Sequence, residues 1–388
     1  MTRDFLCRKL TRFGLVFALL LAGAGAVAEA ADAETGDTLR VLTYNVWHGL
    51  RSGESNKRFP GEDPADKEGR VAAQIREIER LAPDLIFFQE VNPNQPEARK
   101  YAQALGYDEI HKVSSCGLHI GGLYKIPRNM NEGIAILARP ELGLKKIWKK
   151  RLSGNAKCTA TYGFQTKESR YALFGEITVQ GRSLLVATTH LSAPPFVLSA
   201  FEENLEGLVE EGTLDEAQRD EILAQLERKR QRNLAEAEGL LAQVEKRRVD
   251  RKNPGRVRPV VFGGDFNTAP GTPAIEAITA AGFTSVTKGS ELPTWNPAKN
   301  EANYSIGTKR AEPLPTFDLP QIEELLAVRR TTARQIDHLF VSEGLAVESA
   351  EMELDHEVEE RFLSDHFALL AVLRFEASFE QSDQSIVE

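Results

Sequence analysis

The sequence predicts an α/β protein in which a mixed or largely antiparallel β-sheet sandwich is flanked by helices. The first observation is a strand, a helix and a second strand in succession, at residues 39–46, 70–81 and 84–91. Both strands are apolar almost throughout, as in sheets that are covered on both faces. The second observation is that most later strand candidates follow one another without an intervening helix, which favours antiparallel pairing over a doubly wound parallel sheet.

The individual elements rest on hydrophobic spacing. Val71, Ile75, Ile78 and Leu81 recur at the intervals of one helix face. The strand candidates LRVLTYNV and DLIFFQEV are short runs rich in β-branched and aromatic residues. Further strand candidates are residues 133–137, 171–179, 183–189, 259–262, 336–341 and 367–375.

A long amphipathic helix is expected from Thr213 to about Lys246, opened by a capping box between Thr213 and Glu216. A shorter helical piece precedes it at residues 196–209, and the two form a predicted helical insertion at about 196–250. The polar face of the long helix is crowded with Glu, Arg and Lys. A membrane-surface or partner-binding role is one interpretation. We favour a solvated face on a helix that packs against the sheet.

The composition is that of an ordinary globular protein. Hydrophobic residues make up 41% and charged residues 27% of the 388 residues, which excludes a wholly disordered chain, a collagen-like chain and a multi-span membrane protein. Lys and Arg number 48 against 57 Asp and Glu, a net charge of −9. The basic run at 246–259 suggests nucleic-acid binding, but it leads into the N-terminal end of the strand before Asp265, whereas the candidate chemistry lies at the other end.

The first 30 residues are typical of a secretory signal peptide. Four basic residues precede an apolar run at 13–28, and small residues permit cleavage near Ala28 or Ala30. A membrane anchor is the alternative, but the run is short for a span and no basic stop-transfer cluster follows it. Cleavage after Ala30 removes four basic and two acidic residues and leaves 44 against 55, a net charge of −11. We therefore expect a secreted or periplasmic protein with no stable membrane span.

Two cysteines remain after such cleavage, Cys116 and Cys158. In an oxidising compartment a lone pair of cysteines is most simply a disulfide, and both lie in loop-like stretches rich in small polar residues. Two free thiols are the alternative.

Polar side chains stand repeatedly where apolar strands begin or end. Each alone fits a turn former or a satisfied polar group. A repeated pattern of acids, amides and histidines at strand ends is harder to explain as separate turns. These residues are Asn45, Glu90, His190, Asp265 with Asn267, Asp337, and Asp365 with His366.

At these residues the sequence resembles the endonuclease/exonuclease/phosphatase superfamily, also called deoxyribonuclease-I-like. The matching segments run in the family's order and span residues 39–375. They are LTYNVW, FFQEV, NEGIAILAR, SRYALFGEI, ATTHLS, GGDFNTAP, RQIDHLFVS and LSDHFALLAVL. The resemblance implies one domain at 39–375 with a four-layer α/β sandwich, two central sheets covered by helices, and a site at one edge. Residues 376–388 are expected to be a mobile tail.

The resemblance also implies roles for these residues. Asn45 and Glu90 would bind Mg²⁺ or Mn²⁺ through hard oxygen ligands, with Asp365 completing the site. Asp265 and Asn267 would orient the attacking water and a phosphoryl oxygen. The histidines His190 and His366 would contact the phosphate or carry protons, each supported by a carboxylate. The family pattern pairs Asp337 with His366 and Glu132 with His190, and it places Arg170 near the substrate phosphate.

The expected protein is thus an exported, divalent-metal-dependent phosphodiesterase that acts as a monomer. A nuclease acting on DNA or RNA is favoured because Arg170 and Glu132 are present. A sphingomyelinase-like phospholipid hydrolase and a small-molecule phosphatase are the alternatives, although no exposed apolar hairpin is recognisable in the sequence. A binding protein that kept the fold and lost the chemistry is a further alternative. The acidic balance disfavours tight non-specific binding to nucleic acid but does not exclude catalysis on it.

Overall fold

A computed structural model describes residues 38–50, 62–121, 124–126, 129–159, 161–194, 201–249, 257–288, 290–300 and 332–376. The expected signal peptide and nearly all of the expected tail lie outside these residues. From Leu39 onward the chain forms one compact unit. No helix within the described residues is long and apolar enough to cross a membrane.

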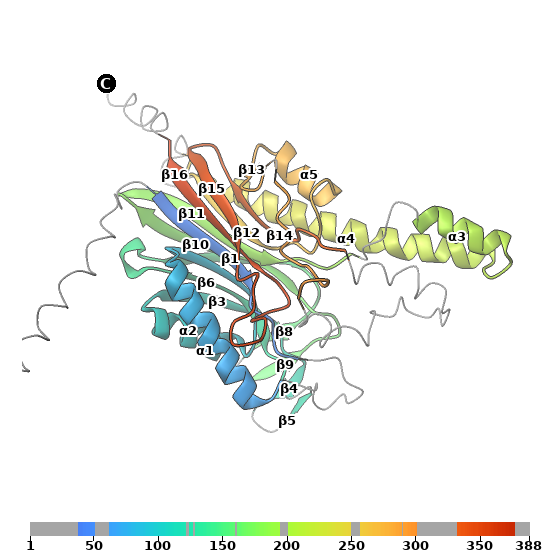
Figure 1. The fold of residues 1–388 in the computed structure, drawn as a ribbon, viewed down its shortest axis with the longest axis horizontal. Helices are drawn as coiled ribbons and strands as arrows, with labels where there is room; N and C mark the ends of the chain where they lie inside the picture. The colour runs from blue at the N-terminus through green and yellow to red at the C-terminus, as the bar shows by residue number, and fades with distance from the viewer. Residues whose placement is uncertain are drawn as a thin grey trace, which may run out of the picture. The chain divides into compact units, whose positions relative to one another are not determined.

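Two six-stranded sheets form the centre of this unit (Figure 1). In spatial order, sheet A contains β15 (Leu345–Glu353), β16 (Ala368–Phe375), β1 (Thr38–Asn45), β2 (Leu85–Val91), β6 (Glu132–Ala138) and β3 (Asp108–Ser115). Sheet B contains β13 (Thr284–Ser285), β14 (Asp337–Val341), β12 (Val260–Asp265), β11 (Arg182–His190), β10 (Arg170–Val179) and β7 (Lys145–Ser153). The pair β1–β2 and the pair β11–β12 are parallel, whereas β2–β6, β10–β11 and β12–β14 are antiparallel. The sheets are therefore mixed, as predicted.

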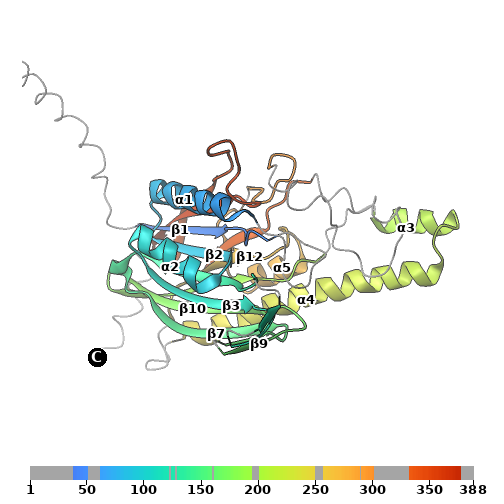
Figure 2. The same ribbon diagram turned by 90° about the horizontal axis from the view of Figure 1, so that it is seen from below.

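The two sheets and the helices on their outer faces form four layers, and a buried apolar cluster lies between each layer and the next. One lies between the two sheets and includes Phe87 of β2 and Val186 of β11. A second joins sheet A to α1 (Pro64–Leu81) and α2 (Asn94–Leu105). A third joins sheet B to α4 (Glu216–Arg248) and α5 (Pro273–Ala280). Figure 1 shows α1 and α2 on one side of the strands and α4 and α5 on the other, and Figure 2 shows α1 and α4 on opposite sides. This is the predicted four-layer α/β sandwich.

The long helix begins later than predicted. Its N-cap is Asp215, whose side chain accepts the backbone N–H of Gln218 while the Gln218 side chain accepts the N–H of Asp215. The predicted box between Thr213 and Glu216 is therefore wrong. Both pairs have the right spacing, but the chain buries Leu214 against α3 (Phe201–Glu210), so the helix starts two residues further on.

A third, small sheet contains β5 (Tyr124–Ile126), β4 (Leu118–Ile120), β9 (Tyr162–Phe164) and β8 (Lys157–Cys158). It carries the disulfide between Cys116 and Cys158, which confirms the predicted pairing.

One face of this small sheet is exposed and apolar. Side chains alternate between the faces of a strand, so Leu118 and Ile120 of β4 share a face with Tyr162 and Phe164 of β9. Their exposed fractions are 41%, 61%, 51% and 51%. We call these four residues the apolar face. No apolar hairpin is recognisable in the sequence, because these four positions are divided between two short strands that pair in space but lie about 40 residues apart in the chain.

Candidate functional site

The polar strand-end residues meet at one edge of the sandwich. In sheet B, His190 at the end of β11 is the register partner of Asp265 at the end of β12. Asp265 is in turn the partner of Asp337, which begins β14. Across the two sheets, Nδ2 of Asn45 donates to Oδ2 of Asp265 at 3.0 Å. This contact brings the ends of β1 and β12 together and closes the site.

Asp265 lies at the centre of the site. Its side chain is 1% exposed, and Oδ1 accepts the backbone N–H of Asn267 at 2.8 Å. The nearest imidazole nitrogens are Nε2 of His190 at 3.4 Å and Nε2 of His366 at 3.8 Å from Oδ2. Burial and the neighbouring Asp337 raise the pKa of Asp265 to about 7. A carboxylate with such a pKa can take up a proton near neutral pH.

The two histidines differ in charge state. Nδ1 of His366 lies 2.8 Å from Oδ2 of Asp337, as the family pattern implied. Burial lowers the pKa of His366, but Asp337 and Asp265 outweigh it and hold that pKa well above the usual value. For His190, burial and the nearby Arg170 push the pKa well below the usual value. The surroundings therefore favour the protonated form of His366 and the neutral form of His190.

Glu90 is held ionised on the sheet A side. Burial alone would raise its pKa, but the neighbouring His48, His190 and His366, together with the Asn45 amide, lower it to about 2. Nε2 of His48 lies 3.5 Å from Oε2 of Glu90, and the His48 backbone N–H donates to the same oxygen at 3.2 Å. The Glu90 side chain keeps 16% exposure, so a small ion can reach it.

Two of the predicted residues have a left-handed backbone. Glu90 has a φ of 57° and Asn267 a φ of 55°. Such values are uncommon for residues with a side chain and concentrate where a structure holds a functional group in place. At Glu90 the pairing of β2 with β6 shifts register, so a bulge turns this side chain out of the strand's regular alternation.

Two groups of residues could hold a divalent cation. Asp265, Asp337 and His366 place one ligand atom each within 4.8 Å of the others. However, this histidine already shares a hydrogen bond with Asp337, and its raised pKa favours a proton over a cation in the cluster. The predicted group of Asn45, Glu90 and Asp365 offers amide and carboxylate oxygens, the donors that Mg²⁺ prefers, and Glu90 in it is ionised and partly open to solvent. The donor chemistry of this second group fits the cation better.

The structure does not bring Glu132 against His190. Although both residues are buried at this edge, their titratable atoms are more than 4.0 Å apart, and the carboxylate within that distance of His190 is Asp265. Glu132 instead lies near Glu168 and Arg170. Burial and Glu168 raise its pKa well above the usual value. Arg170 binds Oε2 of Glu168 at 3.1 Å.

His338 is a residue that sequence reasoning missed. It is fully buried in β14, directly after Asp337. Nε2 lies 2.8 Å from the backbone oxygen of Thr268, and Nδ1 lies 3.3 Å from Nε2 of Gln335. These partners require a neutral ring with the proton on Nε2. His338 therefore fixes the loop that carries Asn267. The only sequence signal is its place beside the acid in QIDH.

We expect His338 to make stability fall in acid. Burial lowers its pKa to about 4, although the hydrogen bond to Thr268 opposes this. Below pH 6.5 the unfolded chain binds a proton that the folded chain refuses, so unfolding is favoured by up to about 3 kcal/mol as the pH falls from about 6.5 to about 4. Urea denaturation across this range should show a steeper loss for the native protein than for His338→Gln. Parallel curves for the two proteins would contradict the assignment.

The long helix α4 is hydrogen-bonded to the two segments that follow β11 and β12. Nδ2 of Asn233 donates to the backbone oxygens of Ser192 at 2.7 Å and Phe266 at 2.9 Å. The buried Glu236 accepts the backbone N–H and the hydroxyl of Ser192, each at 2.7 Å. Ser192 follows His190, and Phe266 follows Asp265. The helix is therefore fastened at the point where β11 and β12 end.

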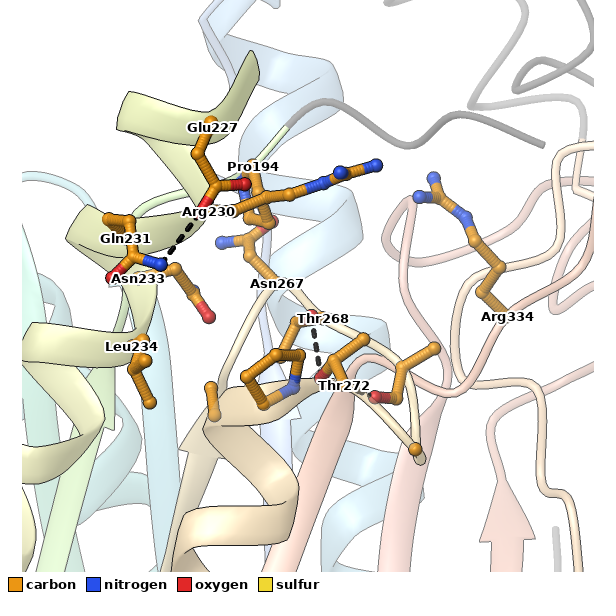
Figure 3. A pocket seen from close by; sticks show the side chains of 14 residues that line it. Pro194, Glu227, Arg230, Gln231, Asn233, Leu234, Asn267, Thr268, Thr272 and Arg334 are labelled. Atoms are coloured by element: carbon orange, nitrogen blue, oxygen red, sulfur yellow. Dashed lines mark hydrogen bonds between the residues drawn. The ribbon is translucent and has the colours of Figure 1, made fainter. Parts of the chain in front are cut away.

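A cavity of about 370 Å³ lies between α4 and the loop after β12. Figure 3 shows Glu227, Arg230, Gln231 and Leu234 on one face of the helix, with the loop that runs from Asn267 below them. Arg334 enters from the opposite side. Asn267 belongs both to this cavity and to the predicted catalytic set.

Two further side chains outside the strand-end group, Trp295 and His111, have partners of their own. Trp295 is half-buried and has the Arg334 guanidinium 4.3 Å from its ring centre. His111 lies 2.8 Å from Oε2 of Glu109 on β3, away from the strand-end residues.

A sequence model described as "Endonuclease/Exonuclease/phosphatase family" matches residues 42–366. The comparison with curated proteins gives no match.

Solved structures resemble this chain in fold. A mannosyl-6-phosphatase from Bacteroides thetaiotaomicron is 17% identical, with a TM-score of 0.50, over 87% of this chain and 100% of that chain. An endonuclease/exonuclease/phosphatase from Bacteroides vulgatus is 17% identical, with a TM-score of 0.51, over 87% and 99%. A functionally unknown conserved protein from Enterococcus faecalis is 17% identical, with a TM-score of 0.51, over 87% and 100%. At this identity the likeness concerns the fold alone.

Proposed function

Because the chain belongs to the endonuclease/exonuclease/phosphatase family, whose members are hydrolases acting on phosphoesters, we propose that it hydrolyses a phosphodiester with the help of a divalent cation, in the manner of a nuclease. The observation that carries the proposal is the Asp265 carboxylate. It is buried, oriented by two hydrogen bonds, and within 4 Å of both His190 and His366. This arrangement suits a proton acceptor next to an anionic substrate.

The residues of the chain divide the work as follows. Asp265 accepts a proton from the attacking water, and Asn45 and the Asn267 backbone hold its carboxylate in place. The His366 imidazolium, held by Asp337, neutralises charge on the phosphate. His190 is neutral and can donate a hydrogen bond to a phosphoryl oxygen.

Glu90, Asn45 and Asp365 would hold the cation, and Mg²⁺ or Mn²⁺ bound there would supply positive charge for the phosphate oxygens. The nuclease-like substrate class is supported by the presence of Arg170 and Glu132 at the same edge.

A phospholipid hydrolase is the second candidate. This candidate is favoured by the apolar face of Leu118, Ile120, Tyr162 and Phe164. Exposed aromatic and aliphatic side chains on a sheet that is held by a disulfide can insert into a membrane surface. Lys157 on the neighbouring strand pairs with Phe164 and adds positive charge beside this face.

A panel of substrates tests these proposals. Supercoiled plasmid, RNA, sphingomyelin vesicles and small phosphomonoesters should be assayed with Mg²⁺ or Mn²⁺ and with chelator. We expect turnover of a nucleic acid that chelator abolishes. Turnover of sphingomyelin alone would replace the nuclease by the second candidate. Absence of chelator-sensitive turnover on every substrate would refute the hydrolase proposal and favour a binding protein on this fold.

We also propose that the protein is exported, as a monomer whose single domain spans 39–375 with the helical insertion at about 196–250. The disulfide between Cys116 and Cys158 supports export because such bonds persist in oxidising compartments. N-terminal sequencing of the protein from the medium or periplasm should begin just after Ala28 or Ala30, and light scattering should give the mass of one chain. Retention of Met1 would contradict the export proposal.

A further inference from the structure

The cavity beside Asn267 has the charge of an anion site. Two of its lining side chains are guanidinium groups, Arg230 and Arg334, and its acid is Glu227. Two neighbouring arginines of α4 have acidic partners: Arg228 pairs with Glu221 and Arg232 pairs with Glu236. Arg230, in contrast, forms no ion pair or hydrogen bond through its side chain with any other residue that the structure describes. Its charge is therefore available to a ligand.

The helix presents Arg230 to the cavity in a fixed way. Asn233, one turn further along α4, is hydrogen-bonded to the loop ends after β11 and β12. Residues three and four apart lie on the same helix face. The anchor at Asn233 therefore directs Arg230 over the loop that starts at Asn267 (Figure 3). Glu227 is occupied in part by Gln231, whose Nε2 donates to Oε1 at 2.6 Å.

The opposite wall of the cavity also holds its guanidinium group in a fixed position. Arg334 packs its guanidinium over the ring of Trp295 at 4.3 Å, which holds the side chain against a rigid surface. Figure 3 shows Arg230 and Arg334 reaching towards one another from the two sides of the cavity. Between them lies the loop with Thr268 and Thr272. The Thr268 hydroxyl donates to Oγ1 of Thr272 at 3.0 Å, and the Thr272 hydroxyl donates to the Ala269 backbone oxygen at 2.8 Å, so the loop is held rigid below the two guanidinium groups.

From these features we infer that the cavity is a subsite for a second phosphate of the substrate, next to the phosphodiester that is cut. The inference rests on the proposed function, because Asn267 is the residue that the catalytic site and the cavity share. A planar guanidinium is suited to phosphate oxygens. Two guanidinium groups also disfavour a cationic headgroup in the same place. The site therefore selects substrates with two phosphates on one molecule, and the insertion helix supplies the selecting charge.

Binding without turnover tests this subsite separately from catalysis. In chelator, a nucleoside 3′,5′-bisphosphate should bind the native protein about tenfold more tightly than the 5′-monophosphate, the size expected for one charge-assisted hydrogen bond to a guanidinium. Arg230→Gln should remove this difference. Arg228→Gln is the matched control, since that residue lies on the same helix, is 62% exposed and does not line the cavity. It should keep the difference.

A sugar pair, fructose 1,6-bisphosphate against fructose 6-phosphate, distinguishes the source of the second phosphate. Tighter binding of the bisphosphate than of the monophosphate that is lost in Arg230→Gln supports the subsite. The pair of compounds that shows it, nucleotide or sugar, identifies the source of the second phosphate. Equal binding of mono- and bisphosphate in both pairs, or a gain that survives Arg230→Gln, would overturn it. Kinetics give the second readout: a terminal phosphate on a dinucleotide should raise kcat/KM about tenfold in the native protein only. If the native protein hydrolysed none of the tested phosphodiesters but still bound the bisphosphate more tightly through Arg230, the proposed function would be refuted and the subsite would be supported.

Discussion

We expect Asp265→Asn to lower kcat for phosphodiester hydrolysis by about 10³-fold. This factor lies within the range for removal of a positioned general base. The substitution keeps the shape of the side chain and removes its capacity to accept a proton. Asp265 is 1% exposed and receives hydrogen bonds from Asn45 and from the Asn267 backbone. Its pKa, raised to about 7 by burial and by Asp337, matches a proton acceptor at neutral pH. KM should change little, because the charge of the bound cation and of His366 remains.

Steady-state kinetics at saturating metal measure this effect, and thermal denaturation checks the fold. Asp355→Asn is the matched control. Asp355 pairs with Lys299 at the surface and lies outside the catalytic edge, so the same chemical change there should leave kcat unaltered. If Asp265→Asn retained more than a tenth of the native kcat, another group would have to be the base.

Glu90→Gln should raise the Mg²⁺ concentration needed for half-maximal activity by at least about tenfold. The reason is that Glu90 contributes a full negative charge: its neighbouring histidines and the Asn45 amide outweigh burial and lower its pKa to about 2. Glutamine keeps one oxygen donor and loses that charge. Activity at saturating Mg²⁺ should recover in large part, which separates loss of metal affinity from loss of chemistry.

Glu132→Gln is the natural comparison for this titration. Glu132 is also a buried glutamate at the same edge, but burial and Glu168 raise its pKa well above the usual value, which favours the neutral carboxyl. Glutamine at this position should therefore change the charge of the site less than glutamine at Glu90, and the Mg²⁺ midpoint should stay close to that of the native protein. An unchanged midpoint for Glu90→Gln would mean that Glu90 is not a ligand. A shift for Glu132→Gln instead would move the ligand assignment to that side of the site.

Much of the sandwich could be predicted because buried strands are recognisable in the sequence as apolar runs. β1, β2, β6 and β12 are nearly continuous apolar runs, and each lies within a few residues of its predicted bounds. Exposed edge strands escaped prediction. β7 has the sequence KKIWKKRLS, in which charge replaces the alternation of buried and exposed positions. Such charges are common on edge strands because they oppose pairing with another chain.

The helix α2 was missed for a different reason. Its sequence NQPEARKYAQAL has few large apolar residues and a proline in its first turn, and its N-cap Pro93 makes no side-chain cap. What holds it is the burial of Ala98, Tyr101 and Ala102 against sheet A. Tertiary packing outweighs a weak local signal here.

The candidate site shows the same division. Asn45, His190 and Asp265 could be named because they follow apolar strands, and the pairing of His366 with Asp337 follows from the family pattern. The expected contact of Glu132 with His190 did not appear, since it depends on side-chain directions across two strands. Arg230 gave no sequence signal at all, because its place beside Asn267 depends on how α4 docks.

The position of β1 has a consequence for protein synthesis. It lies between β2, made soon after it, and β16, the last strand of the chain. Sheet A therefore cannot be completed on the ribosome until almost the whole polypeptide has emerged. Until then, the edge of β1 that pairs with β16 has no partner strand. The Ser364 hydroxyl, which bonds the Asn45 backbone oxygen at 2.7 Å, arrives equally late. A chain that stops before Ser364 therefore lacks β16, this hydrogen bond, Asp365 and His366 together.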